Sequence, residues 1–298
     1  MAKTMIDQTI KNKIKKITIH TKRIMHSPLA GDYLSAFKGS GLEFHQIRDY
    51  YHGDDIRAID WNSSAKMNKI MIKQFVEERD RTIILAIDVS GSTAYSSQNE
   101  LRQETIEQLA GTLAFIASEN KDKVGALFFS DTVEQWIAPS KGNVHIGKII
   151  ETIFTIKPKN KTTNIAEALR FLINLKKRNA VVFMISDWIA PTDTFDKLLK
   201  VASCEYDFVG MRILDPREHE FPDIGFLDIR DSETGLLVTL DTRNKSSDQS
   251  VSHFLKTRLT AQKRMFEKYR IDLLDLSVAQ PFINPLIKFF HQRIRRHI

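Results

Sequence analysis

The sequence lacks the features that would mark a secreted or membrane-spanning protein. Cys204 is the only cysteine among 298 residues, which excludes an internal disulfide and a cysteine-cluster metal site. No uninterrupted hydrophobic run approaches the ~18–20 residues that cross a bilayer. The N-terminus carries lysines but neither an apolar block nor a small-residue cleavage site, so no signal peptide is predicted. These absences predict a cytoplasmic protein without a transmembrane segment.

Basic residues gather at the two ends of the chain, whose net charge is +7. Residues 1–26 hold seven Lys/Arg against one acid, and the last eleven residues add four more, so the middle is slightly acidic. Nucleic acid is therefore not indicated as a partner. Isoleucines at helical spacing predict a basic amphipathic helix over residues 6–19. Its apolar stripe is expected to pack on the main domain, and docking on anionic lipid or nucleic acid is the alternative.

Strand and helix patterns alternate from about residue 81 onward. Short apolar runs predict strands, and helical spacing of apolar residues follows most of them. This order predicts an α/β domain with a doubly wound, mainly parallel sheet and ligand sites at the carboxyl ends of the strands. The predicted strands are Thr82–Asp88, Val124–Phe129, Val133–Ile137, Ala180–Ile185, Tyr206–Ile213 and Ile271–Val278.

One stretch interrupts this alternation. Ile224–Ile229 and Leu236–Leu240 flank a polar loop that ends in Gly235, which predicts a β-hairpin inserted into the domain over about residues 216–243. A long helix over roughly 247–270 follows. We therefore expect an N-terminal extension over residues 1–80 and the α/β domain, with its insertion, over 81–298.

Three predicted loops carry oxygen ligands. Asp88, Ser90 and Ser92 follow the first apolar strand, Thr163 comes just before a helix, and Asp187 follows the strand Ala180–Ile185. If the loops meet at one edge of the sheet, their carboxylates and hydroxyls form a hard donor set that suits Mg²⁺, or alternatively Mn²⁺ or Ca²⁺. Few inner carboxylates would leave the metal open to an acidic side chain from a partner.

This three-part pattern resembles the metal-ion-dependent adhesion site of von Willebrand factor A-like domains. The resemblance implies a von Willebrand factor A/Rossmann-like fold in which Asp88, Ser90, Ser92, Thr163 and Asp187 hold the metal.

A second motif lies upstream, in residues 43–61, and resembles the bacterial family of unknown function numbered fifty-eight. The family pattern R-x-Y-x-x-G-D-x-x-R-x-I-D-W falls on Arg48, Tyr50, Gly53, Asp54, Arg57, Asp60 and Trp61, and Tyr51-His52 stands where relatives often have a proline. The resemblance implies an adaptor that works with a MoxR-type AAA+ ATPase in assembly or maturation of client proteins. The transmembrane hairpin of some relatives is absent, which points to a soluble member.

The residues of this motif also have a purely structural interpretation. Arg48, Asp54, Arg57 and Asp60 are expected to form an ion-pair network that pins the segment to the α/β domain. Tyr50 and Trp61 are expected to be core anchors.

Two segments resemble catalytic or nucleotide-binding motifs. Asp88 at a strand end suits the nucleophile of a Mg²⁺-dependent phosphatase, but the position two residues on is Ser90, so the second acid of that chemistry is missing. Residues 142–149 nearly match a phosphate-binding loop, but Ile149 replaces the hydroxyl that would hold Mg²⁺. We therefore expect a non-enzymatic binding module, with the phosphatase as an alternative.

Overall fold

The computed structural model describes residues 42–77, 81–91, 102–160, 162–177, 180–216, 225–230, 237–241 and 245–296. It divides into a small compact unit, Lys38–Arg81, and a larger unit that contains Thr82–Ile298. The helix predicted over residues 6–19 and the candidate ligand Ser92 lie outside the described residues.

The larger unit is built on a six-stranded sheet with the strand order β10-β7-β6-β3-β4-β5. Neighbouring strands are parallel except for β5, which pairs antiparallel with β4 at one edge. This confirms an α/β fold with a mainly parallel sheet. The strands are β3 (Thr82–Asp88), β4 (Lys123–Phe129), β5 (Val133–Ser140), β6 (Val181–Ser186), β7 (Asp207–Leu214) and β10 (Asp272–Ser277).

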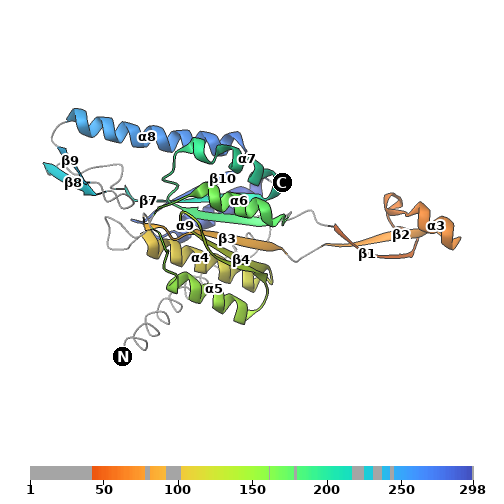
Figure 1. The fold of residues 1–298 in the computed structure, drawn as a ribbon. Helices are drawn as coiled ribbons and strands as arrows, with labels where there is room; N and C mark the ends of the chain where they lie inside the picture. Colours follow the sequence, from red (N-terminus) through yellow and green to blue (C-terminus); the bar gives the residue numbers. More distant parts are fainter. Residues whose placement is uncertain are drawn as a thin grey trace, which may run out of the picture. The chain divides into compact units, whose positions relative to one another are not determined.

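Helices cover both faces of this sheet (Figure 1). One face packs against α4 (Arg102–Glu119), α5 (Asn143–Thr155) and α9 (Ile283–Arg296). The other face packs against α6 (Ile165–Leu175), α7 (Asp196–Glu205) and the C-terminal part of α8 (Lys245–Lys268). A short 3-10 helix, η3 (Thr192–Thr194), precedes α7.

The continuous apolar runs arise because each central strand is buried on both faces. In β3, Ile83, Leu85 and Ile87 point into the core below α4, while Ile84 and Ala86 belong to the opposite core. Successive side chains of a strand point to opposite faces, so a strand between two helical layers needs an apolar residue at every position. Asp88, the acid that ends β3, therefore lies at the carboxyl-terminal edge of the sheet.

Residues 142–149, the near-match to a phosphate loop, form the start of an ordinary core-facing helix. Gly142 precedes α5 with a positive φ of 100°, and no side chain caps the helix. Ile146, Ile149 and Ile150 are buried against the sheet. The hydrophobic stripe accounts for this segment.

A separate two-stranded antiparallel sheet consists of β8 (Phe226–Arg230) and β9 (Leu237–Asp241). These strands fall within the stretch that interrupted the alternating pattern, each shifted by one or two residues from the predicted runs. The helix α8 follows them and returns the chain to the main sheet, where β10 adds at the edge beside β7.

The small unit consists of an antiparallel pair, β1 (Leu42–Asp49) and β2 (Met71–Glu77), with a 3-10 helix, η1 (Ile56–Ala58), and α3 (Trp61–Met67) between them. Met71 and Ile72 are buried, whereas neither η1 nor α3 contains a buried residue. A unit of this size can bury only a few side chains.

The family motif folds locally within this unit. Arg48 donates two hydrogen bonds to Asp54, of 2.7 and 2.9 Å, which hold the pKa of Asp54 down to about 2. Gly53 has a φ of +105°, a conformation that favours glycine, in the turn between them. Asp60 caps α3 by accepting from the backbone N–H of Asn62 and Ser63.

Two expectations for the motif were wrong. Arg48–Asp54 and Lys73–Asp60 are separate ion pairs inside the unit, and Arg57 joins no ion pair among the described residues. The single network predicted for the four residues is therefore not formed. Trp61 is not a core anchor, because its side chain is 69% exposed at the first position of α3, where the small interior does not reach. Tyr50 is partly buried.

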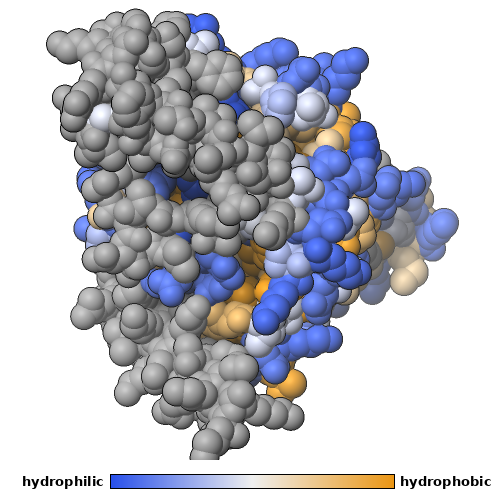
Figure 2. Space-filling model, turned by 60° about the vertical axis from the view of Figure 1, so that its left-hand side comes forward, coloured by the Kyte–Doolittle hydropathy of each residue, from blue (hydrophilic) through white to orange (hydrophobic). Residues whose placement is uncertain are grey.

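Hydrophilic side chains cover much of the described surface on the face drawn in Figure 2, with hydrophobic ones visible in patches between them. Within the described ranges, no helix has the length and apolar character of a membrane span.

Candidate metal centre at the carboxyl ends of β3 and β6

The candidate site is centred on Asp88, the last residue of β3. β3 lies beside β6 in parallel, so the loops that follow both strands emerge at the same edge of the sheet. Oδ1 of Asp88 accepts a 2.9 Å hydrogen bond from the backbone N–H of Ser90, and Oδ2 accepts one of 2.6 Å from the hydroxyl of Ser186. The carboxylate is therefore fixed in orientation by its own loop and by the neighbouring strand.

The surroundings of Asp88 disfavour its charge. Its side chain is almost fully buried, and burial raises its pKa, with a further rise from the negative charge of Asp187. The hydrogen bonds from Ser186 and Ser90 act in the opposite direction, and the resulting pKa is about 7. A bound cation would favour the ionised carboxylate by supplying the missing positive charge.

Thr163 comes to this site from a third segment. Its hydroxyl donates a 2.7 Å hydrogen bond to the hydroxyl of Ser90. The next residue, Asn164, caps α6 through its side chain, and its backbone N–H donates to the carbonyl of Ser130, just beyond β4. The start of α6 is thus tied to the strand next to β3, which positions Thr163 against the Asp88 loop.

Asp187, directly after β6, is held by a buried ion pair. Its Oδ2 accepts a 3.1 Å hydrogen bond from Nη1 of Arg102, and the two side chains are 1% and 2% exposed. Its Oδ1 accepts from the backbone N–H of Ile189. The predicted ligand is therefore present at the site, but a guanidinium from the start of α4 already neutralises it.

The loop after β6 is locked in a strained conformation at Trp188. Its φ of 58° is in the left-handed region that a bulky residue rarely adopts. Its N–H donates to the hydroxyl of Ser186, its carbonyl accepts a 2.6 Å hydrogen bond from Gln262 of α8, and its ring packs edge-on against Phe266. These contacts hold Asp187 in place.

The structure thus brings together four of the five predicted ligands: Asp88, Ser90, Thr163 and Asp187. The described residues contain no cluster of three or more His, Cys, Asp and Glu that could hold a metal ion, so a cation here would depend on hydroxyl ligands. One carboxylate and two hydroxyls suit a hard divalent cation in their chemistry. Asp88, Ser90 and Thr163 are therefore suitable ligands for a divalent cation, whereas Asp187 is already paired with Arg102.

Sequence reasoning predicted none of the contacts made by Arg102, Ser186, Trp188 and Gln262. Only Arg102 carried a usable signal, because an arginine in the first turn of a helix opposes the helix dipole and implies a negative partner. The other three contacts depend on which strands and helices become neighbours.

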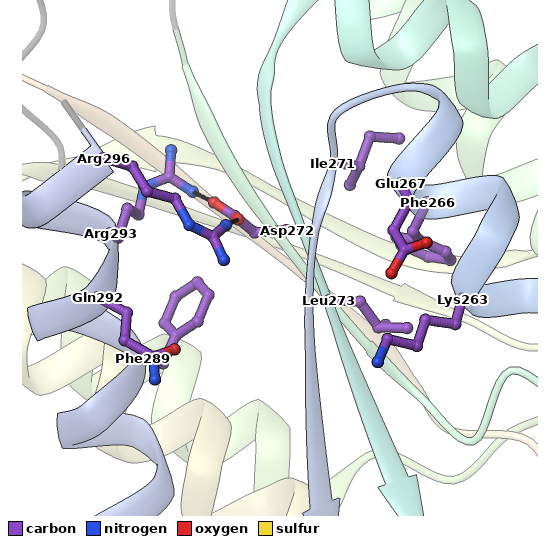
Figure 3. A pocket seen from close by; sticks show the side chains of 10 residues that line it. All are labelled: Lys263, Phe266, Glu267, Ile271, Asp272, Leu273, Phe289, Gln292, Arg293 and Arg296. Carbon is purple, nitrogen blue, oxygen red and sulfur yellow. Dashed lines mark hydrogen bonds and ion pairs between the residues drawn. The ribbon is translucent and has the colours of Figure 1, made fainter. Parts of the chain in front are cut away.

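Two adjoining cavities, of about 540 and 160 Å³, lie elsewhere, around the amino ends of β7 and β10. Figure 3 shows Arg293 and Arg296 of α9 directed at Asp272 of β10, with side chains of α8 beyond the strand. Arg293 also pairs with Asp207. These charges neutralise one another across the sheet and α9, so we interpret the cluster as structural.

Comparisons with known proteins found relatives in several bacteria. It is 24% identical over 233 residues to the uncharacterized proteins Mb1516 of Mycobacterium bovis and Rv1480 of Mycobacterium tuberculosis, which covers 78% of this chain and 73% of each relative. It is 29% identical over 79 residues to the uncharacterized protein YeaD of Bacillus subtilis, which covers 26% of this chain and 20% of that relative.

Among solved structures, similarity was found to the conserved hypothetical protein BatB from Bacteroides thetaiotaomicron. The TM-score is 0.49 and the sequence identity 14%, and the match covers 72% of this chain and 99% of that one. The family model described as "Protein of unknown function DUF58" matches residues 46–260. The chain therefore belongs to the DUF58 family.

Proposed function

We propose that this protein is a non-enzymatic, metal-dependent protein-binding module with a von Willebrand factor A-like domain and an inserted hairpin. In this proposal Asp88, Ser90, Ser92 and Thr163 hold Mg²⁺, with Asp187 as the distal acid. The bound ion would supply an electrophilic position that an acidic side chain of a partner can occupy. We further propose that it is a cytoplasmic adaptor whose partner is a MoxR-type AAA+ ATPase.

The observation that carries the proposal is the convergence of oxygen donors from separate segments. The Thr163 and Ser90 hydroxyls are 2.7 Å apart, and Ser90 is also bonded through its N–H to Asp88. Tight turns often contain Ser and Asp for local reasons. Local turn formation, however, gives no reason for a threonine from another loop to lie against Ser90.

Hydrolysis is the weaker alternative, because Asp88 is poorly arranged as a phosphoryl-accepting nucleophile. No second carboxylate follows two residues later to move the proton. The buried residue that contacts the other acid of the site is Arg102, which cannot serve as a general base.

Metal binding is tested first on the full-length protein by titration calorimetry with Mn²⁺ and Mg²⁺. The wild type is expected to bind one ion, and Asp88→Asn is expected to abolish binding. Glu119→Gln, which removes an exposed acid at the far end of α4, is the control and is expected to bind normally. Equal Mn²⁺ binding by the wild type and Asp88→Asn would refute the proposed site.

Partner binding is then tested by mixing the protein with a purified MoxR-type ATPase, with Mg²⁺ or with EDTA. The ATPase is expected to be captured in Mg²⁺ but not in EDTA, because the metal and the partner each raise the affinity for the other. Capture that is the same in EDTA would reject a metal-dependent contact. Release of phosphate from an aryl phosphate with Mg²⁺, lost in Asp88→Asn, would favour the phosphatase instead.

A further inference from the structure

A positive side chain lies inside the proposed metal centre. The Arg102 guanidinium donates to Asp187 at 3.1 Å, and only 2% of the side chain is exposed. We propose that Arg102 is the resident cation of the site, which competes with a divalent ion for Asp187 and makes the ion-loaded site select an anionic ligand. This inference rests on the proposed function.

Two energetic penalties accompany a positive side chain at position 102. Arg102 lies at the start of α4, where the partial positive charge of the helix dipole opposes a second positive charge. Burial adds a desolvation penalty for the guanidinium, which the ion pair with Asp187 offsets in part.

The charge balance explains what the arginine changes. When both aspartates are ionised, Asp88 and Asp187 provide two negative charges and Arg102 provides one positive charge, so the net charge of the site without a metal is −1. A divalent ion makes the total positive by one. A single carboxylate from a partner then restores neutrality. If residue 102 were neutral, the two aspartates would balance the ion by themselves.

Arg102 is therefore expected to have opposite effects on the two ligands. It lowers the affinity for the cation, because the like charges repel and both compete for Asp187. It raises the affinity for the anion, because the metal-loaded site keeps an uncompensated buried charge until a partner's carboxylate binds. The arginine thus couples the ion to an acidic partner more tightly than the oxygen ligands alone would.

The test is Mn²⁺ titration of the full-length protein, with and without acetate as the carboxylate probe. Arg102→Gln is expected to raise Mn²⁺ affinity by about tenfold or more, and to reduce the gain in affinity that acetate gives. Arg102→Lys keeps the charge and is expected to resemble the wild type. Arg170→Gln removes an exposed arginine that pairs with Glu167 on α6, and is expected to change neither quantity.

The outcomes separate this inference from the proposed function. If wild type and Arg102→Gln bind Mn²⁺ equally, or if acetate helps both equally, the role of Arg102 is refuted while the metal site stands. If no protein binds Mn²⁺, both are refuted. Should Arg102→Gln fail to fold, Mg²⁺ is added to the ¹⁵N-labelled wild type. The Arg102 Nε–H resonance, assigned by its loss in Arg102→Lys, is expected to shift, and an unchanged resonance overturns the inference.

Discussion

The hydroxyl of Thr163 donates a hydrogen bond to the hydroxyl of Ser90, 73 residues earlier in the chain. This bond joins the loop after β3 to the start of α6, and Asp88 is attached to the same loop through the N–H of Ser90. Two hydroxyl oxygens thereby lie beside a carboxylate at the edge of the sheet. Experiment can decide whether these two hydroxyls only form a structural hydrogen bond or also bind a metal ion.

Replacing Thr163 with valine removes the hydroxyl and keeps the shape of the side chain. We expect stability to fall by only about 1 kcal/mol, the usual contribution of one hydrogen bond, while Mn²⁺ affinity falls by about tenfold or more. Urea unfolding and titration calorimetry measure the two effects. Thr155→Val on α5 is the control, because its exposed hydroxyl bonds only the preceding turn. A variant that loses stability but keeps its Mn²⁺ affinity would make Thr163 a purely structural residue.

The raised pKa of Asp88, about 7, makes the metal-free protein sensitive to pH. Because the folded pKa lies above the unfolded one, the folded state binds more protons, and stability is lost as pH rises from about 4 to about 7. Asp88→Asn removes this dependence. In EDTA at pH 8 we expect the variant to be more stable than the wild type by on the order of 2–4 kcal/mol, and the difference to vanish below about pH 4.

The measurement is urea unfolding in EDTA across this pH range, repeated with Mg²⁺. Mg²⁺ is expected to stabilise the wild type at pH 8 and to leave Asp88→Asn unaffected. A constant difference between the two proteins at every pH would contradict the assigned ionisation.

Gln262 supports the site from α8. It donates to the Trp188 carbonyl and accepts a 2.7 Å hydrogen bond from Arg212, itself bonded to Asp275. Gln262→Leu removes one of the two hydrogen bonds at the Trp188 carbonyl, which also accepts from the N–H of Ala190, and one of those donated by Arg212, so we expect a loss of about 1–3 kcal/mol. Mn²⁺ affinity should also fall, because the strained Trp188 backbone is released and Asp187 with it. Gln280→Leu, at an exposed turn, is the comparison in the same unfolding and titration assays. Unchanged Mn²⁺ affinity would separate Gln262 from the site.

Two glycines give opposite expectations for alanine substitution. At Gly210 in β7 a Cβ would come within 2.4 Å of the Phe266 ring, so Gly210→Ala is expected to cost about 1–3 kcal/mol through overpacking. At Gly147 in α5 the space is open, so Gly147→Ala is expected to stabilise by about 0.5–1 kcal/mol through helix propensity. Thermal and urea unfolding of both variants check the signs. A stabilised Gly210→Ala would show that Phe266 does not pack on β7 as described.

The strands of the sheet were predictable because their burial repeats along the chain itself. Thr82–Asp88 was predicted with its observed bounds, and Val124–Phe129 and Ala180–Ile185 were within a residue of theirs. In each case an apolar residue is needed at every position, and a polar residue ends the run at the sheet edge. The exposed Trp61 was not predictable, because its exposure depends on how little core the small unit forms.

Local composition predicted the strands of the main sheet, and it placed Asp88, Ser90 and Asp187 after such strands and Thr163 before a predicted helix. The tertiary structure alone decided that β6 lies beside β3, that Ser186 bonds Asp88, and that Arg102 reaches Asp187 from 85 residues away. The physical reason is one of range. Periodicity and capping are fixed by neighbours within a few residues, whereas the charge of a buried site depends on which distant side chains the packed layers bring into contact.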